Sequence, residues 1–137
     1  MTALLEMIQQ HYHHLAEGDM DAATEVFDPD VETVTPGGTL KGLEEFRALG
    51  ETFSMAMEGM RHDIVRSFED GDTIIVESIF SGRHTGPMVT PEGSIPPSGN
   101  QVSFAYADFL QARDGKFVSH RIYWDNLALM AQLGVAP

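Results

Sequence analysis

Cysteine is absent from this chain of 137 residues. Without a thiol the chain can form no disulfide bond, thiolate metal site or thiol nucleophile. Basic residues are also scarce, because eight Lys and Arg stand against 21 Asp and Glu and leave a formal net charge of −13. Such a surface repels phosphate backbones and anionic lipid, so the composition argues against binding to nucleic acid or a membrane surface.

The chain also lacks long apolar runs. Its first residues contain neither the basic segment nor the sustained apolar run of a signal peptide or membrane span, so we expect a cytoplasmic protein. Apolar residues make up 42% and charged residues 21%, the balance of a folded domain. With no internal repeat or linker, this length predicts one domain spanning residues 1–137.

Helical spacing of apolar residues dominates the first part of the chain. It predicts an amphipathic helix over Leu4–Glu17 and a longer one over Leu43–Met57. A short helix follows an aspartate N-cap at Asp19 or Asp21, and Pro29 prevents its continuation. Residues 31–35 alternate like a strand between these helices.

The second half alternates with the period of strands. Four strands are predicted, over Met60–Phe68, Thr73–His84, Gln101–Ala112 and Lys116–Trp124. Residues 86–100 are rich in proline and glycine and predict a surface flap, and residues 127–133 predict a final helix. Helices followed by hairpin-linked strands indicate an α+β fold, a curved antiparallel sheet forming a cone with the N-terminal helices on its concave face. A ligand cavity is expected inside the cone.

Strand register places polar residues on one face of the last hairpin. A two-residue turn at Asp114-Gly115 pairs Arg113 with Lys116. One face then carries Phe104, Tyr106, Asp108, Arg121, Tyr123 and Asp125. Burial of Asp108 on this apolar strand would raise its pKa toward that of a useful acid. The alternative is an ion pair between Asp108 and Arg121 on the outer face of the sheet.

Three further residues are candidates for chemistry or binding. Asp125 ends the last strand, where it is either a rigidly held catalytic group or the N-cap of the final helix. His84 precedes the flap and is either a proton donor at the pocket mouth or a surface histidine. His11 lies beside the apolar stripe of the first helix, where it either lines the pocket or is hydrogen-bonded in the interior.

A metal site is not predicted. His11, His13, His14 and Glu17 have helical i, i+3 and i+4 relations, but the histidines form no single ligand face with matching ligands elsewhere. The chain also has no nucleophile elbow, phosphate-binding loop or dinucleotide fingerprint.

Several segments resemble the SnoaL-like polyketide cyclases, within the nuclear-transport-factor-2-like or cone-fold superfamily. They are the run Arg113–Asp125 that continues into Leu127–Gly134, and the flap segments Gly82–Gly86 and Pro96–Gly99. The resemblance runs nearly end to end. It implies a homodimer of cone-shaped domains, each with a buried pocket for a hydrophobic carbonyl compound and with neither cofactor nor metal. Asp125 matches the position of the aspartate that acts as general acid/base in aldol closure.

Two other branches of the superfamily are less similar. Limonene-epoxide hydrolases have a second aspartate near the position of His84, so the resemblance argues against epoxide hydrolysis. In ketosteroid isomerases the oxyanion-hole aspartate aligns with Asp108, but the general base aligns with Thr35, which argues against that isomerisation mechanism.

The leading hypothesis is therefore an acid/base enzyme of the cyclase or isomerase type acting on a hydrophobic carbonyl compound. Asp125 would move a proton next to the carbonyl, and Asp108 or His84 would stabilise the enolate. Substrate-binding candidates are Phe53, Met57, Phe104, Tyr106, Trp124, Arg121 and His11. The alternatives are a non-catalytic domain that binds a small molecule in the same pocket, and a dimerisation domain without a pocket.

Overall fold

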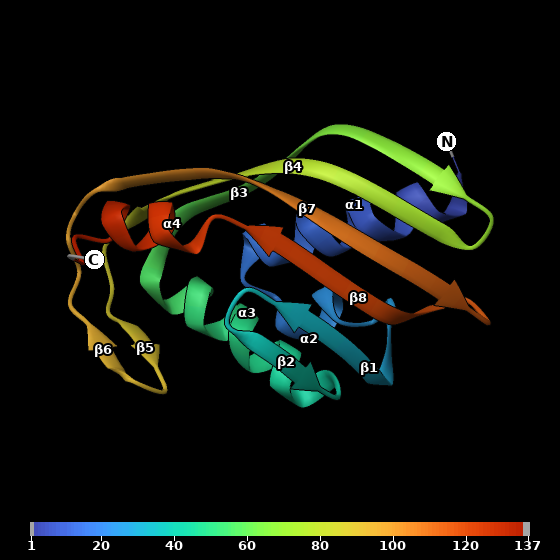
Figure 1. Ribbon diagram of the computed structural model, residues 1–137, viewed down its shortest axis with the longest axis horizontal. Coiled ribbons are helices and arrows are strands. Elements are labelled where there is room, and N and C mark those ends of the chain that lie inside the picture. Colours follow the sequence, from blue (N-terminus) through green and yellow to red (C-terminus); the bar gives the residue numbers. More distant parts are fainter. Residues whose placement is uncertain (1, 136–137) are drawn as a thin grey trace.

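The computed structural model describes residues 2–135, and its main sheet contains the predicted strands together with one over residues 38–41 that was not predicted. The sheet has six strands in the order β2-β1-β8-β7-β4-β3. Their bounds are β1 (Phe27–Thr35), β2 (Gly38–Lys41), β3 (Met57–Asp70), β4 (Thr73–His84), β7 (Gln101–Arg113) and β8 (Lys116–Trp124). Helices α1 (Ala3–Glu17), α2 (Met20–Ala23) and α3 (Leu43–Ala56) lie along the sheet (Figure 1).

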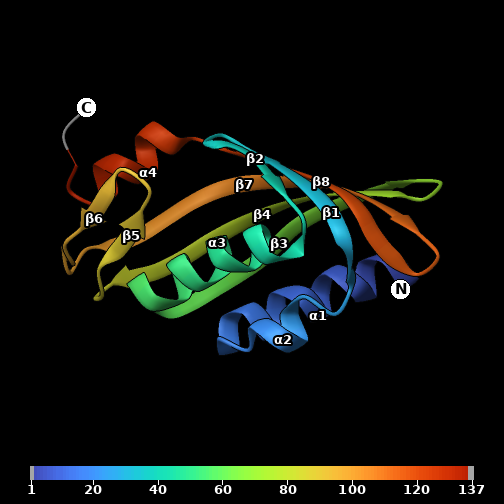
Figure 2. The ribbon, with the colours of Figure 1, turned by 90° about the horizontal axis from the view of Figure 1, so that it is seen from below.

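The α+β prediction is confirmed, including a curved sheet with the N-terminal helices on its concave face. Helix α1 contacts β3, and α3 contacts both β1 and β3, so the helices span the hollow of the sheet (Figure 2). One pairing differs from the expected antiparallel pattern, because β1 runs parallel to β8. The sheet is also open, since β2 and β3 are its edges.

The predicted elements differ from the structure mainly in the first third of the chain. Helix α2 ends at Ala23, because the following residues turn into β1 at Phe27. Pro29 therefore lies within a strand, in the segment between Phe27 and Glu32 where the pairing with β8 shifts register. A proline can occupy that stretch because the ladder is interrupted there, so its missing N–H leaves no ladder hydrogen bond unmade.

The flap contains a small hairpin of its own, with strands β5 (Met88–Thr90) and β6 (Gly93–Ile95). This hairpin and helix α4 (Asn126–Gln132) lie at the same end of the molecule, opposite the end where the N-terminus lies (Figure 1). Within residues 2–135, no helix has both the length and the apolar character that crossing a membrane requires.

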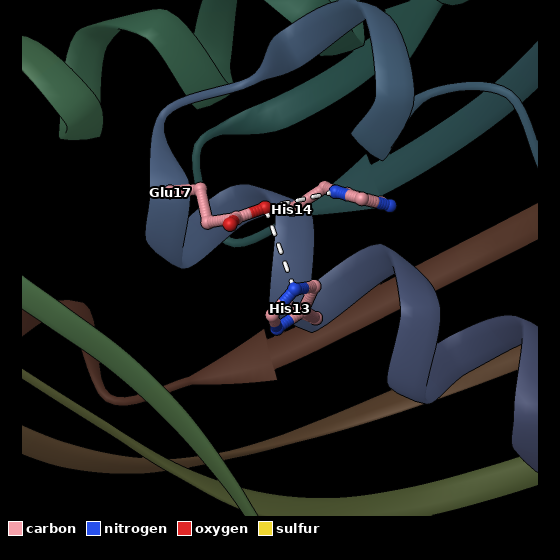
Figure 3. Close-up of side chains that lie close together, drawn as sticks. All are labelled: His13, His14 and Glu17. Atoms are coloured by element: carbon pink, nitrogen blue, oxygen red, sulfur yellow. Dashed lines mark hydrogen bonds and ion pairs between the residues drawn. The ribbon is translucent and has the colours of Figure 1, made fainter.

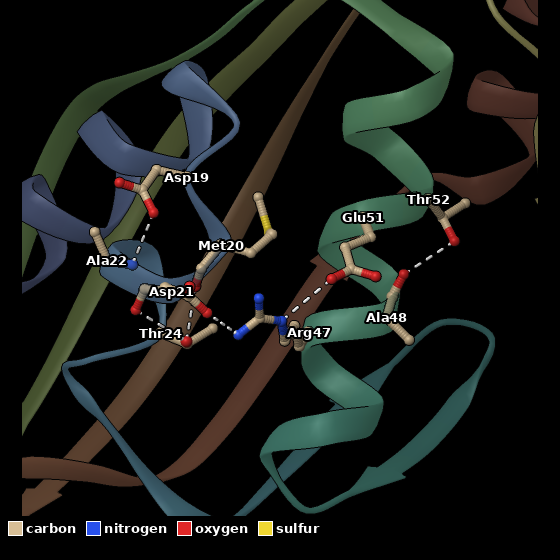
Figure 4. Close-up of polar contacts among 9 residues, drawn as sticks. All are labelled: Asp19, Met20, Asp21, Ala22, Thr24, Arg47, Ala48, Glu51 and Thr52. Atoms are coloured by element: carbon tan, nitrogen blue, oxygen red, sulfur yellow. Dashed lines mark hydrogen bonds and ion pairs between the residues drawn. The ribbon is translucent and has the colours of Figure 1, made fainter.

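Helices α2 and α3 are held together by a charged side chain and by a glycine. Arg47 of α3 reaches Asp21 of α2 and also Glu51 on its own helix (Figure 4). Gly50 lies against Met20, and a Cβ atom at this position would stand 2.9 Å from the Met20 sulfur. The glycine lowers helix propensity by about 1 kcal/mol relative to alanine, but it lets the two helices approach closely.

The hairpin of β7 and β8 contains a β-bulge that the sequence did not reveal. Arg113 pairs with Lys116 as predicted, but the register shifts between Gln111 and Ala112, and Val118 is left without a partner. An extra residue in one strand moves every later side chain to the opposite face. The predicted opposition of Asp108 and Arg121 is therefore wrong, because Asp108 is opposite Ile122.

Candidate active site

The concave face of the sheet encloses a cavity of about 100 Å³. Helices α1 and α3 close it from one side, and β3, β4, β7 and β8 form the opposite wall. Most of its lining is apolar or aromatic, which is the composition expected of a ligand site. The lining residues are His11, Tyr12, Leu15, Phe46, Leu49, Gly50, Phe53, Met60, His62, Phe80, Phe104, Tyr106, Asp108, His120, Ile122 and Trp124.

A carboxylate and an imidazole form a buried pair in this cavity. Nε2 of His120 donates to Oδ1 of Asp108 at 2.9 Å, and both side chains are almost fully buried. Tyr12 donates its hydroxyl hydrogen to the other carboxylate oxygen of Asp108. On the far side of the ring, Nδ1 of His120 lies 3.4 Å from the Thr33 hydroxyl, which is long for a hydrogen bond.

The electrostatics of Asp108 differ from the sequence-based expectation. Burial alone would raise the pKa of its carboxyl, but the positive charge of His120 and the hydrogen bonds from His120 and Tyr12 outweigh burial and lower it. The predicted increase in pKa is therefore wrong. At neutral pH Asp108 is ionised, so it accepts hydrogen bonds and protons rather than donating them.

His11 is held in one tautomer by the backbone of α2. Its Nδ1 lies 2.6 Å from the carbonyl oxygen of Ala23, and because a carbonyl only accepts, Nδ1 carries the hydrogen. Nε2 of His11 is therefore an unprotonated acceptor, and the ring lines the cavity. Burial lowers the pKa of His11 to about 4, so the ring is neutral at physiological pH. Both expectations for His11 hold, since it lines the pocket and is hydrogen-bonded in the interior.

His62 has a buried nitrogen without a partner. Its Nδ1 lies 2.9 Å from the hydroxyl of Tyr106, and its ring stacks on Tyr12. Its Nε2 has no hydrogen bond to any of the described residues. Burial lowers the pKa of His62 to about 4, and burial also raises the pKa of Tyr106 and keeps its phenol protonated. A buried polar atom left unpaired costs about 1–3 kcal/mol, which a ligand atom can offset by bonding to it.

The structure brings six of the predicted site residues to the cavity wall. They are Phe53, Phe104, Tyr106, Asp108, Trp124 and His11. Tyr12, His62 and His120 were not among the predicted site residues. Without the bulge, the register of the hairpin places His120 on the face away from Asp108. Tyr12 belongs to the apolar stripe of the first helix, and His62 follows Met60 at the two-residue spacing of a strand face, so both left a weak signal.

Four other predicted residues do not line the cavity, namely Asp125, Arg121, Met57 and His84. Asp125 is exposed, and its side chain accepts from the backbone N–H of Ala128 as the N-cap of α4, so the capping alternative is confirmed. Arg121 points outward because of the bulge. Met57 is buried at the start of β3, outside the lining.

His84 is buried rather than placed at a pocket mouth or on the surface. Its Nδ1 accepts from the backbone N–H of Ser98 at 3.2 Å, and the Ser98 hydroxyl lies 2.9 Å from the same nitrogen. The backbone N–H of His84 also donates to the backbone carbonyl of Asn100. These contacts fix the end of the flap, and the ring lies outside the cavity lining.

An outer groove of about 740 Å³ adjoins the cavity, between α3, the β5–β6 hairpin and α4. Leu49, Phe53 and Trp124 line both hollows. The other groove residues are Thr35, Gly37, Leu40, Glu45, Ala48, Thr52, Met88, Val89, Thr90, Pro91, Glu92, Gly93, Ser94, Ile95, Asn126, Leu129, Met130 and Val135.

The histidines at the end of α1 form a separate cluster. The ligand atoms of His13, His14 and Glu17 lie within 4.8 Å of one another (Figure 3). Glu17 lies 3.4 Å from His13 and 3.1 Å from His14, so the three side chains already pair among themselves. His13 and Glu17 are exposed, and no fourth metal-ligating group in the described part of the chain joins the cluster.

The fold and the cavity define a cone-fold domain with a buried polar site. The family model described as SnoaL-like polyketide cyclase matches residues 6–133, and the chain belongs to this family. No protein of curated function matches its sequence.

Solved structures of the same shape cover nearly the whole chain. TsrD from Streptomyces laurentii is 25% identical with a TM-score of 0.84, over 98% of this chain and 96% of TsrD. A putative SnoaL-like polyketide cyclase from Jannaschia sp. CCS1 is 19% identical with a TM-score of 0.84, over 98% and 94% of the two chains. TerC, co-crystallised with polyporic acid, is 20% identical with a TM-score of 0.76, over 97% and 99%.

Proposed function

We propose that this chain is a cytoplasmic, cofactor-free acid/base enzyme that acts on a hydrophobic carbonyl compound by aldol cyclisation or isomerisation. The observation that carries the proposal is the buried pair of Asp108 and His120 in a mostly apolar and aromatic cavity. Removing two ionisable groups from water is costly, and such groups concentrate at functional sites. Membership of the SnoaL-like family supports the same reaction class.

The Asp108–His120 pair acts as the proton acceptor. In the form of the pair that accepts a proton, the imidazole is neutral and donates to the carboxylate, so that form carries one negative charge. It takes a proton from the carbon next to the substrate carbonyl and becomes an imidazolium–carboxylate ion pair, while the substrate becomes an enolate. In an aldol closure the enolate carbon attacks a second carbonyl carbon of the same molecule, and the pair returns the proton to the new alkoxide oxygen.

Neutral hydrogen-bond donors stabilise the enolate. When Tyr106 donates to Nδ1 of His62, Nε2 of that ring carries the hydrogen and has no other partner. A donor already fixed in a cavity of low polarity stabilises developing negative charge without having to reorganise. This role belongs to His62, which Tyr106 holds in that tautomer, in place of Asp108 or His84, because Asp108 is ionised and His84 lies outside the cavity lining.

Deuterium exchange tests this proposal. The protein should accelerate incorporation of deuterium from D₂O at the α-carbon of 2-tetralone, an uncharged bicyclic ketone, measured by NMR against buffer alone. His120→Gln should slow the exchange by about 100-fold or more, the usual contribution of a general base. The matched control is His13→Gln, which changes an exposed histidine of α1. Binding of 2-tetralone without faster exchange would support the non-catalytic alternative.

We also propose a homodimer formed through the convex face of the sheet. This face comprises the outward residues of β3, β4, β7 and β8, and it exposes the large apolar side chains of Phe68, Ile79, Phe109 and Tyr123. Between the strand pair Phe68–Ile75 and the strand pair Glu58–Arg83, the outward positions of this face carry four of the eight basic residues of the chain. They carry only three of its 21 acidic residues. The acidic three are Glu58, Asp63 and Glu77. Two strongly negative copies repel each other least at such a charge-balanced face.

A further inference from the structure

The cavity is too small to hold a complete substrate of the proposed kind. The cavity has a volume of about 100 Å³. Sites for drug-sized ligands are about 300–1,000 Å³, a range that includes the outer groove at about 740 Å³. Because Leu49, Phe53 and Trp124 line both hollows, a ligand can extend from one into the other.

The chemistry of the outer groove limits what can lie in it. Apolar side chains from four parts of the chain line it, including Leu40, Met88 and Leu129. Its charged residues are Glu45 and Glu92, and no lysine or arginine occurs among the described residues that line either hollow. An anionic group placed here would lose hydration with no cation to pair with, inside a chain of net charge −13.

We propose that the outer groove binds the uncharged apolar body of the substrate, and that it excludes molecules with a phosphate, sulfonate or carboxylate on that body. The reacting carbonyl end passes between Phe53 and Trp124 into the cavity. This inference rests on the proposed function for the identity of the reacting end, but the charge selectivity of the groove is independent of any reaction.

Two fluorescent probes with the same ring system test the selectivity. N-phenyl-1-naphthylamine is uncharged, and 8-anilino-1-naphthalenesulfonate adds a sulfonate. We expect the uncharged probe to bind the full chain about tenfold or more tightly than the anionic one, measured by the increase in probe fluorescence. Equal affinities would overturn the exclusion of anions.

The single tryptophan reports where the probe binds. Trp124 is the only tryptophan of the chain and lies at the junction of the two hollows. Acrylamide quenches an indole only on contact, so a probe in the groove should lower the quenching constant of Trp124. Unchanged quenching with the uncharged probe bound would overturn its location in the groove.

A single added cation should weaken the selectivity. Ala48→Lys places an ammonium in the outer groove, on an exposed position of α3. We expect it to raise the affinity for the sulfonate relative to that for the uncharged probe by about fivefold or more. Ala16→Lys adds the same charge at an exposed position of α1 outside both linings, and should change neither affinity. An equal effect of both variants would overturn the assignment to the groove.

Failure of this inference and failure of the proposed reaction can be told apart. His120→Gln should lose α-carbon exchange while it retains the preference for the uncharged probe. Exchange without probe selectivity would overturn the role of the groove alone. Selectivity without exchange would overturn the proposed reaction alone.

Discussion

Nε2 of His120 lies 2.9 Å from Oδ1 of Asp108, and the two side chains expose only 1% and 4% of their surface. Both come from neighbouring strands, β8 and β7, but they are not directly opposite, because Asp108 is opposite Ile122 and His120 is opposite Leu110. The diagonal arrangement places both on the inner face. A pair of well-packed apolar residues is often as stable as a buried ion pair, so stability alone does not account for these two residues.

Replacing Asp108 should lower the stability of the fold. Asp108→Asn keeps the size of the side chain but removes the buried charge that His120 contacts, so the unfolding free energy should fall by about 3 kcal/mol. Urea unfolding at pH 7 measures this loss. The control is Asp63→Asn, which breaks an exposed ion pair with Arg61 and should cost about 0.5 kcal/mol or less. Equal stability of Asp108→Asn and the wild type would contradict an ionised Asp108 in the native state.

Asp125 should behave as a helix cap. Its carboxylate accepts from the N–H of Ala128, and asparagine caps about as well as aspartate, so Asp125→Asn should leave both melting temperature and α-carbon exchange unchanged. Asp125→Ala should lower the unfolding free energy by about 1 kcal/mol. If Asp125→Asn lost turnover with an unchanged melting temperature, Asp125 would be a catalytic residue after all.

Stability should fall between pH 6.5 and pH 4. His11 and His62 have a pKa of about 4 in the folded protein and 6.5 as the reference value, so in this range the unfolded chain binds protons that the folded chain excludes. The unfolding free energy therefore decreases as pH falls, by up to about 3 kcal/mol for each histidine. Urea unfolding at pH 7.0, 5.5 and 4.5 measures it.

His11→Gln provides the comparison for this pH dependence. Glutamine can still donate to the carbonyl of Ala23 but does not titrate, so the loss of stability on acidification should be about half that of the wild type. A profile without slope between pH 6.5 and 4.5 would show that neither histidine is buried in its neutral form.

Deletions in β8 should distinguish the bulge from the regular ladder. Val118 has no partner, and the pairs on both sides of it would remain in phase without it, so its deletion should cost only about 1–3 kcal/mol. Deletion of Arg121 instead turns Ile122 and Trp124 outward and Tyr123 inward, and we expect loss of cooperative unfolding. Circular dichroism melts compare the two. A Val118 deletion as damaging as the Arg121 deletion would contradict the bulge.

The oligomeric state should depend on Phe109. A lysine in place of this partly exposed phenylalanine adds a charge in the middle of the convex face, so Phe109→Lys should be monomeric where the wild type is dimeric. Light scattering coupled to gel filtration measures the mass. Leu127→Lys is the control, since Leu127 is an exposed apolar residue of α4 outside that face. A dimer that survives Phe109→Lys and dissociates with Leu127→Lys would assign the interface to α4 instead.

Local patterns in the sequence determined most of the fold. Alternation predicted β4 over Thr73–His84 without error, and helical spacing predicted α1 to within one residue, because both elements bury one regular face. The Asp114-Gly115 turn and the Asp125 cap were also readable, since each depends on a few neighbouring residues. The predicted pocket positions His11, Tyr106 and Asp108 followed from the same faces.

Only the tertiary structure decided which polar groups meet in the cavity. Because of the bulge at Val118, the inner face carries His120, Ile122 and Trp124 where Arg121 and Tyr123 were predicted. No local pattern marks an unpaired residue in a strand. The pKa of Asp108 likewise depends on Tyr12, which is 96 residues away in the sequence, and on His120 across the hairpin. Charges and hydrogen bonds act through space, so the sequence can supply these groups but cannot by itself place them together.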